Sequence, residues 1–242
     1  ATFSLKKLPP QESISTIAPG TLATAQALHK SYPYALGTIL FALLPAEVKR
    51  GEKTFPNVFS PRPNSAPTFL PQLMVAKRTD RIRNYRSLIR STFAHRGSVI
   101  IVVPSQSHIA PLVASIDTGI EDRVVAYSGS SKTALKKFYA AFEDCSKAKV
   151  FIVPPSHAFL DRHDITTLII EEAHSQHYAG RTQPYLDYRT ALHAYARATA
   201  KDLVLGDTCA RSDEVVQLRQ EVYLPYDEEP KRLDLPATLT YV

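Results

Sequence analysis

The feature that most constrains this chain is the run Leu168-Ile169-Ile170-Glu171-Glu172. Three aliphatic residues predict a short buried strand, and two carboxylates follow where that strand runs out. In sheets of parallel strands, ligands bind beyond the carboxyl ends of the strands. The run therefore predicts a site with paired carboxylates or, in the plainer interpretation, a strand that simply enters solvent.

The segments around this strand alternate between strand-like and helix-like patterns. Apolar and β-branched runs predict strands at residues 73–76, 98–103, 124–128, 150–153, 165–170 and 203–205. The segments between them predict helices at residues 80–95, within 104–116, and at 132–143 and 186–200. Such alternation predicts an α/β fold with an open, mostly parallel sheet and helices on both faces.

The first 71 residues follow a different pattern. Leu36, Ile39, Leu40, Leu43 and Leu44 recur at helical spacing and predict a buried helix, which Pro45 closes. Residues 51–71 are rich in proline, asparagine, serine and threonine, which is typical of a linker. We therefore expect a domain boundary near residue 70.

The charge balance favours an anionic partner. The formal net charge is +6, and many basic residues fall in residues 77–96 and 132–149. Nucleic acid fits better than a membrane, since no apolar run approaches the roughly 20 residues of a membrane span. No secretory leader is visible, so we expect a cytoplasmic protein. Cys145 and Cys209 lie far apart, which argues against a disulfide framework or a structural zinc site.

Several motifs, taken in order, resemble the primosomal protein N′ family, the PriA replication-restart helicases. The family's acidic box is similar to Glu171-Glu172-Ala173-His174. The aromatic loop that follows it in the family is similar to the segment with Tyr178, Pro184 and Arg189, and the next strand end is similar to Leu205-Gly206. Two earlier strand ends are similar to Ile101–Pro104 and Tyr127–Ser130, and Tyr32–Pro45 resembles the end of the family's winged-helix domain. The resemblance covers nearly the whole chain.

The resemblance implies a RecA-like lobe of the P-loop-NTPase type at residues 72–242, after a winged-helix remnant at residues 1–50 and a linker at residues 51–71. It also implies roles at the acidic box. Glu171 would reach Mg²⁺ through water, Glu172 would polarise the attacking water, and His174 would relay to bound nucleic acid.

The phosphate-binding loop departs from the family pattern. Where the family has a glycine-rich loop ending in Lys-Thr, this chain has a degenerate loop made of Lys77, Arg78, Thr79, Asp80 and Arg81. It contains no glycine, Asp80 would repel phosphate, and no hydroxyl follows Arg81 to hold Mg²⁺. Residues 154–156 and 207–210 depart from the family as well. We expect a protein without ATP hydrolysis and without a cofactor. The alternative is an active 3′-5′ DNA helicase that binds ATP and Mg²⁺ through an atypical loop.

Two groups of residues are candidates for nucleic-acid binding. Arg83, Arg86 and Arg90 predict a basic helix surface that tracks phosphates, or else a solvated helix face. Tyr178, Tyr185 and Arg189 lie in the segment that resembles the family's DNA-sensing aromatic loop, although aromatics there could equally pack on the sheet edge.

The resemblance also implies partners. They are forked or single-stranded DNA, single-strand-binding protein and other primosome components, in a role in replication restart. A further alternative is an interaction scaffold with no nucleic-acid role.

Three other patterns are weaker. Residues 128–133 superficially resemble a phosphate loop but are better explained by a helix cap at Ser130 or Ser131. Glu171, His174 and His177 could suggest a metal site, yet spacing on a loop is poor support, and we expect no metal. Ser105, His108 and Asp117 form no recognisable hydrolase motif.

Overall fold

The computed structural model describes residues 17–50, 69–129 and 131–226. Its helices are α1 (Pro19–His29), α2 (Leu36–Leu43), α3 (Ala46–Lys49), α4 (Arg78–Ala94), α5 (Ile109–Ile116), α6 (Lys132–Glu143), α7 (Tyr188–Ala198) and α8 (Ser212–Arg219). Its strands are β1 (Gln72–Val75), β2 (Ser98–Val102), β3 (Val124–Ala126), β4 (Val150–Val153), β5 (Ile165–Glu171), β6 (Asp202–Asp207) and β7 (Leu224–Pro225). Short 3-10 turns are η2 (Gln106–His108), η3 (Glu121–Arg123), η4 (Pro155–His157) and η5 (Gln176–Tyr178).

The described strands form a seven-stranded sheet in the order β3-β4-β2-β5-β6-β1-β7, and every neighbouring pair is parallel. Strand β5 lies at the centre, with Ile169 paired to Ile101 of β2 and to Val204 of β6. The residues of β2 and β4 are buried throughout, as expected for strands covered on both faces. The predicted α/β fold with a mostly parallel sheet is confirmed.

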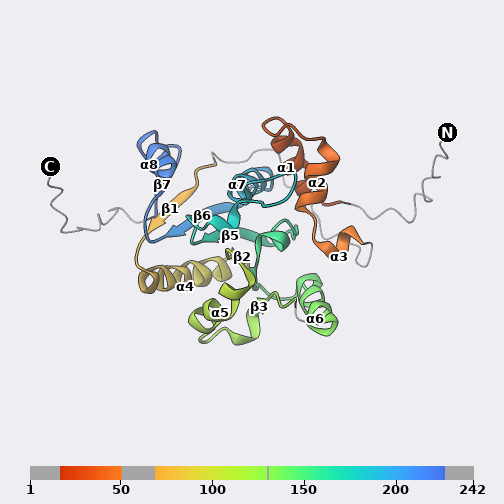
Figure 1. Cartoon of the computed structure of the whole chain (residues 1–242). Helices are drawn as coiled ribbons and strands as arrows, with labels where there is room; N and C mark the ends of the chain where they lie inside the picture. The colour runs from red at the N-terminus through yellow and green to blue at the C-terminus, as the bar shows by residue number, and fades with distance from the viewer. Residues whose placement is uncertain (1–16, 51–68, 130, 227–242) are drawn as a thin grey trace.

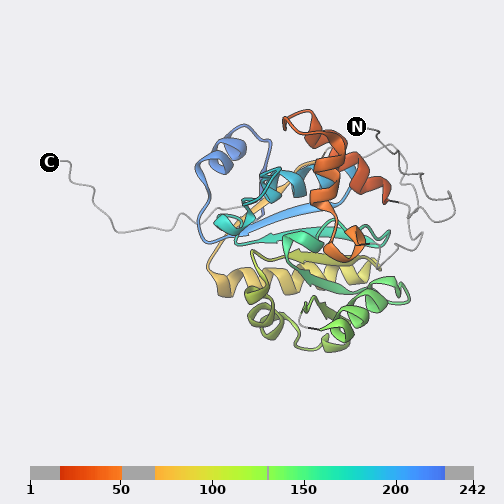
Figure 2. The same cartoon turned by 45° about the vertical axis from the view of Figure 1, so that its right-hand side comes forward.

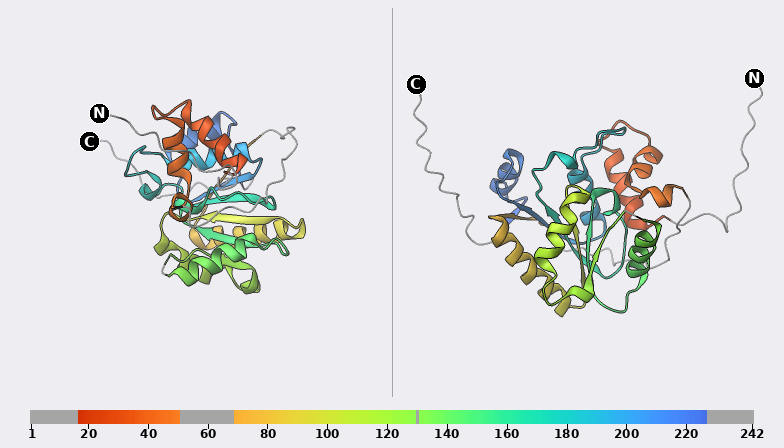
Figure 3. Two further views of the ribbon diagram at one scale, coloured as in Figure 1. Left: turned by 90° about the vertical axis from the view of Figure 1, so that its right-hand side faces the viewer. Right: turned by 60° about the horizontal axis from the view of Figure 1, so that its bottom comes forward.

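Helices cover both faces of the sheet (Figure 1). One core cluster joins the sheet to α1, α2, α6 and α7, with Phe151, Leu168 and Leu192 among its members. The other joins the opposite face to α4 and α5 through residues such as Tyr85 and Ile169. In the right-hand view of Figure 3, α4 and α5 lie in front of the sheet. Side chains that point outward from α4 and from α7 therefore lie on different sides of the molecule.

The N-terminal helices share the core of the sheet domain. α1 packs against both α2 and α7, and buried residues of α1 and α2 such as Leu28 and Ile39 belong to the same cluster as α7. α7 lies between these helices and α8, which sits at the edge formed by β1 and β7 (Figures 1 and 2). The division into a winged-helix remnant, a linker and a lobe stays a prediction. Much of it, at residues 1–16, 51–68 and 227–242, lies outside the described residues.

Most predicted elements are present, with small shifts of their ends. The helix α2 begins at Leu36, as predicted, and ends at Leu43. The clearest difference concerns the degenerate loop, because α4 begins at Arg78 and only Ala76 and Lys77 separate it from β1. Residues Arg78 to Arg81 are thus helical and not part of a loop. Without glycine, this segment has no residue that opposes helix formation strongly. None of the described helices is long and apolar enough to cross a membrane.

Candidate functional site

The carboxyl ends of β1, β5 and β6 meet at one edge of the sheet. Val75 at the end of β1 pairs with Asp207 at the end of β6, and Glu171 at the end of β5 pairs with Gly206. Because α4 starts two residues after β1, its first turns lie beside these strand ends. This register brings Arg81 of α4 to Glu171.

Arg81 and Glu171 form a buried, bidentate ion pair. Arg81 Nη2 lies 2.8 Å from Glu171 Oε1, and Arg81 Nε donates to Oε2 at 3.2 Å. Only 2% of the Arg81 side chain and 5% of the Glu171 side chain are exposed. Arg81 Nη1 also donates to the Ala76 carbonyl and to Thr208 Oγ1, each at 2.9 Å. One guanidinium thus connects β1, β5 and the residues after β6.

Tyr85 completes the shell around Glu171. Its hydroxyl donates to Glu171 Oε2 at 2.6 Å, and the side chain is fully buried. Burial raises the pKa of Tyr85 well above its ordinary value, and the charge of Glu171 raises it further, so the phenol keeps its proton and remains a donor. Gly206 makes this approach possible, since a Cβ there would lie 1.7 Å from the Tyr85 hydroxyl. Both oxygens of Glu171 are therefore occupied by protein donors.

The ionisation of the pair follows from its geometry. Burial alone would lower the pKa of Arg81, but the hydrogen bonds and charge of Glu171 outweigh this effect and raise the pKa above its ordinary value. A buried charge is tolerated only when its partner and its hydrogen bonds are in place. The arrangement is self-contained, and the charge of Glu171 is balanced without a metal ion.

Glu172 and His174 point to different partners. Glu172 has a left-handed backbone with φ of 51°, which is uncommon for a residue with a side chain, and its carboxylate lies 3.5 Å from His108 Nε2. His174 Nδ1 lies 2.7 Å from Oδ1 of buried Asp207, and the His174 backbone N–H donates to Oδ2 at 2.6 Å. Glu171 and Glu172 line a small pocket of about 260 Å³. The roles predicted for Glu171, Glu172 and His174 stay predictions.

Sequence reasoning missed three members of this site, namely Tyr85, Asp207 and Thr208. A signal existed for one of them, because Arg81 and Tyr85 are four residues apart and so share one helix face. Asp207 and Thr208 follow an apolar strand just as Glu171 does, but only the register of β6 against β5 and β1 brings them to the same edge.

Three of the predicted nucleic-acid residues lie at the surface. The Arg83 side chain is 78% exposed and faces Asp80 at 3.3 Å, and Arg90 is exposed on the same side of α4. Tyr185 is 56% exposed in the loop that precedes α7. The α4 residues and Tyr185 lie on elements that cover opposite faces of the sheet, so they do not form one surface.

The other three are engaged by the protein itself, and their role in nucleic-acid binding stays a prediction. Arg86 Nη2 donates to the Ser115 carbonyl of α5 at 2.6 Å. Tyr178 is fully buried, with its hydroxyl 2.9 Å from the Val102 carbonyl oxygen and 2.8 Å from that of Glu171. Arg189 binds Asp187 and donates to the Ala173 carbonyl at 3.0 Å. A buried phenol has no face free for stacking on a base.

The weaker patterns have ordinary explanations. Ser131 caps α6 by accepting from the Ala134 backbone N–H at 3.1 Å, as the helix-cap interpretation predicted, while residue 130 lies outside the described part. Ser105 Oγ lies 2.7 Å from His108 Nδ1 within one turn of chain. The described residues contain no group of three or more side chains placed to hold a metal ion.

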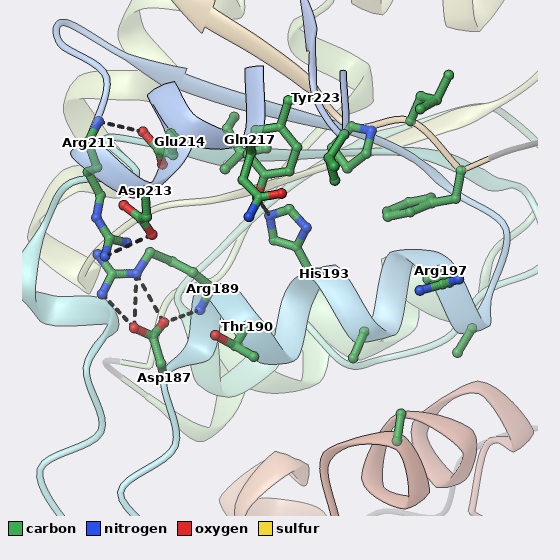
Figure 4. A pocket seen from close by; sticks show the side chains of 18 of the residues that line it. Asp187, Arg189, Thr190, His193, Arg197, Arg211, Asp213, Glu214, Gln217 and Tyr223 are labelled. Atoms are coloured by element: carbon green, nitrogen blue, oxygen red, sulfur yellow. Dashed lines mark hydrogen bonds and ion pairs between the residues drawn. The ribbon is translucent and has the colours of Figure 1, made fainter. Parts of the chain in front are cut away.

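A wide cleft of about 890 Å³ lies between α7 and α8 (Figure 4). Two of its arginines pair with carboxylates, Arg189 with Asp187 at 2.6 Å and Arg211 with Asp213 at 3.3 Å. His193 stacks on Tyr223 with ring centroids 5.4 Å apart, and the two share a hydrogen bond of 3.0 Å. Burial lowers the pKa of His193 to about 4.

Comparisons with known proteins give only distant similarities. No family model matches the sequence, and no curated protein matches it. The UvsW helicase of bacteriophage T4 is similar over 64% of this chain and 52% of that chain, with 11% identity and a TM-score of 0.43. The helicase domain of Pyrococcus furiosus Hef is similar over 66% of this chain and 36% of that one, with 15% identity and a TM-score of 0.46.

A third solved structure is the C-terminal domain of a possible DNA helicase from Lactobacillus plantarum WCFS1. It is similar over 65% of this chain and 86% of that one, with 15% identity and a TM-score of 0.42. The chain spans about half the length of the UvsW chain. The strand order and register define the fold here, and these similarities add no argument about activity.

The buried pair gives a first prediction. Arg81→Met leaves the Glu171 carboxylate buried without its partner and should lower the free energy of unfolding by about 3–5 kcal/mol. Glu171→Gln should also destabilise, because it leaves Arg81 unpaired. In the double variant both charges are gone, and the amide that replaces the carboxylate can still accept from Tyr85. The double variant should therefore lose less free energy of unfolding than the two single variants together, by about 1–3 kcal/mol.

Urea unfolding of the four proteins measures this coupling. The matched control is Asp80→Asn with Arg83→Met, an exposed ion pair on the same helix whose coupling should stay below about 1 kcal/mol. Strict additivity at Arg81 and Glu171 would contradict a tightly coupled pair.

The half-buried His193 gives a second prediction. Between pH 6.5 and about 4 the unfolded chain binds a proton at His193 that the folded chain does not, so stability falls as the pH falls through this window. The loss is at most about 1.4 kcal/mol per pH unit for one proton. His193→Phe should remove this part of the pH dependence, as measured by urea unfolding across the window.

Burial also lowers the pKa of His157, so some pH dependence should remain in the variant. His95→Phe, at an exposed position, is the control and should leave the wild-type slope in place. If the dependence of the free energy of unfolding on pH is unchanged in His193→Phe, this histidine is protonated in the folded protein.

Proposed function

We propose that this chain is a helicase-type lobe that binds DNA and does not hydrolyse ATP. The observation that carries the proposal is the Arg81–Glu171 ion pair. By the sequence resemblance, Arg81 stands where the family has its phosphate-binding lysine, and Glu171 stands where it has the Mg²⁺ carboxylate. In this chain the two side chains bind each other.

A nucleotide site at this edge would require that pair to open. Water-mediated Mg²⁺ binding needs an accessible lone pair on the carboxylate, whereas the Glu171 carboxylate is buried and accepts from Arg81 and Tyr85. Breaking a buried pair costs about 3–5 kcal/mol. A nucleotide that can bind only after the pair has opened therefore loses roughly a hundred- to a thousand-fold or more in affinity. The two-residue connection between β1 and α4 also leaves no loop of backbone amides to surround phosphates.

Charge supports a role in DNA binding. The chain carries a net charge of +6, and Arg83 and Arg90 project from the outer side of α4. Phosphate contacts by such side chains provide sequence-independent affinity. The finer role that goes with the resemblance is replication restart on forked or single-stranded DNA, together with single-strand-binding protein and primosome components.

The nucleotide half of the proposal gives a third prediction. Mg-ATP should bind more weakly than about 1 mM, which corresponds to about −4 kcal/mol, as measured by titration calorimetry on the whole chain. DNA should not stimulate hydrolysis, and Glu172→Gln should leave the phosphate release of the sample unchanged because there is no turnover to lose. Micromolar affinity, or turnover abolished by Glu172→Gln, would favour the active helicase instead.

The DNA half gives a fourth prediction. Arg83→Ala with Arg90→Ala should weaken binding to forked DNA about equally for all sequences and lower the slope of log affinity against log salt by roughly one to two. Fluorescence anisotropy at several salt concentrations measures both quantities. The matched control removes two exposed lysines of α6, Lys136→Ala with Lys137→Ala.

If wild-type protein shows no salt-dependent affinity for fork or single strand, DNA binding is wrong and the scaffold alternative replaces it. If the α4 variant and the α6 control change the affinity for forked DNA and its salt slope equally, α4 presents only a solvated face.

A further inference from the structure

A second groove, of about 430 Å³, lies between the N-terminal helices and the loop at residues 179–187. Phe41 of α2 and Lys49 of α3 line one side, Arg181 and Thr182 of the loop line the other, and His177 also lines it. We call it the α2–loop groove. Its volume falls within the range of ligand sites and gives room for part of one nucleic-acid strand.

The α2–loop groove is basic. Among the described residues that line it none is acidic, and within the described part of the chain neither Lys49 nor Arg181 forms an ion pair. The nearest carboxylates on the same elements have other partners, Glu47 facing His157 at 3.3 Å and Asp187 bound by Arg189. The cations in this groove are therefore available to an anion.

Exposed aromatic rings accompany these cations. Phe41 is 57% exposed, and Lys49 Nζ lies 4.8 Å from the centre of its ring. Tyr185, next to the lining residue Pro184, is 56% exposed. Exposed rings beside cations are the combination with which proteins bind single strands, because bases stack on the rings while the cations contact phosphates.

The loop that forms one side is held in a fixed shape. An antiparallel bridge between Ala179 and Asp187 closes it, and the Gly180 N–H donates to the Leu186 carbonyl at 2.8 Å. A Cβ at Gly180 would lie 2.7 Å from that carbonyl oxygen, so only glycine fits there. Tyr185 adopts φ of 50°, a strained conformation for a bulky residue.

We propose that the α2–loop groove binds single-stranded DNA, with Lys49 and Arg181 at phosphates and Phe41 stacking on a base. This inference rests on the proposed DNA-binding function and assigns the single strand to a surface separate from α4. A duplex is the poorer fit, because its bases are stacked on one another and present no face to Phe41. The N-terminal helices thereby supply half of the site.

Anisotropy of a fluorescent oligothymidine with the whole chain tests this. Phe41→Ala should weaken binding by roughly 5- to 100-fold and leave the salt slope unchanged, since it removes stacking and no charge. Lys49→Gln with Arg181→Gln should lower the slope of log affinity against log salt by about 1.4, because each phosphate contact to a single strand contributes about 0.7.

Each variant has a matched control among residues that do not line the groove. Leu22→Ala removes an exposed apolar side chain from α1, and Lys136→Gln with Lys137→Gln removes two exposed charges from α6. Both controls should bind oligothymidine like wild type, and circular dichroism should show that all variants are folded.

Three outcomes overturn the inference in different ways. If wild-type protein binds but the groove variants match their controls, the groove is wrong while the DNA-binding function stands. If wild-type protein does not bind any single strand, the function itself is wrong. If oligouridine binds more tightly than oligothymidine, the occupant is single-stranded RNA.

Discussion

The structure depends on one buried ion pair at the carboxyl edge of its sheet. Arg81 reaches from the first turns of α4 to Glu171 of β5, and its remaining donors bind the end of β1 and Thr208 beyond β6. Two charges can be buried together only if nearly all of their hydrogen bonds are made. Tyr85 provides the last of these bonds, and Gly206 leaves the space that Tyr85 requires. Several strand ends and one helix therefore hold one another in place.

In the proposed function, this pair is what closes the nucleotide site. The edge where parallel sheets normally bind ligands is filled by the protein's own side chains, and what remains nearby is a pocket of about 260 Å³. The surfaces suited to an anionic polymer lie elsewhere, at Arg83 and Arg90 on α4 and in the α2–loop groove. These surfaces are on elements that cover opposite faces of the sheet.

The sequence predicted the sheet well because buried parallel strands such as Leu168–Ile170 carry their own apolar signal. Side-chain partners were harder to predict. Arg81 belongs to a run of basic residues that is typical of a solvated helix face, and only the tertiary register shows that it points inward. Tyr178 ends the three-residue turn η5, which is too short to show periodicity, so no pattern indicated that its ring is buried. The α2–loop groove was missed because Phe41 and Lys49 lie far along the chain from the loop at residues 179–187 that forms its other side.

The most direct measurement of the central claim is the side-chain nuclear magnetic resonance signal of Arg81 Nε, assigned through its loss in Arg81→Met. A guanidinium held in a buried ion pair should give a slowly exchanging Nε–H signal, and millimolar Mg-ATP should leave it unshifted. If the signal exchanges as fast as that of exposed Arg83, or moves when Mg-ATP is added, then Arg81 is free to bind phosphate and the account of a closed nucleotide site is wrong.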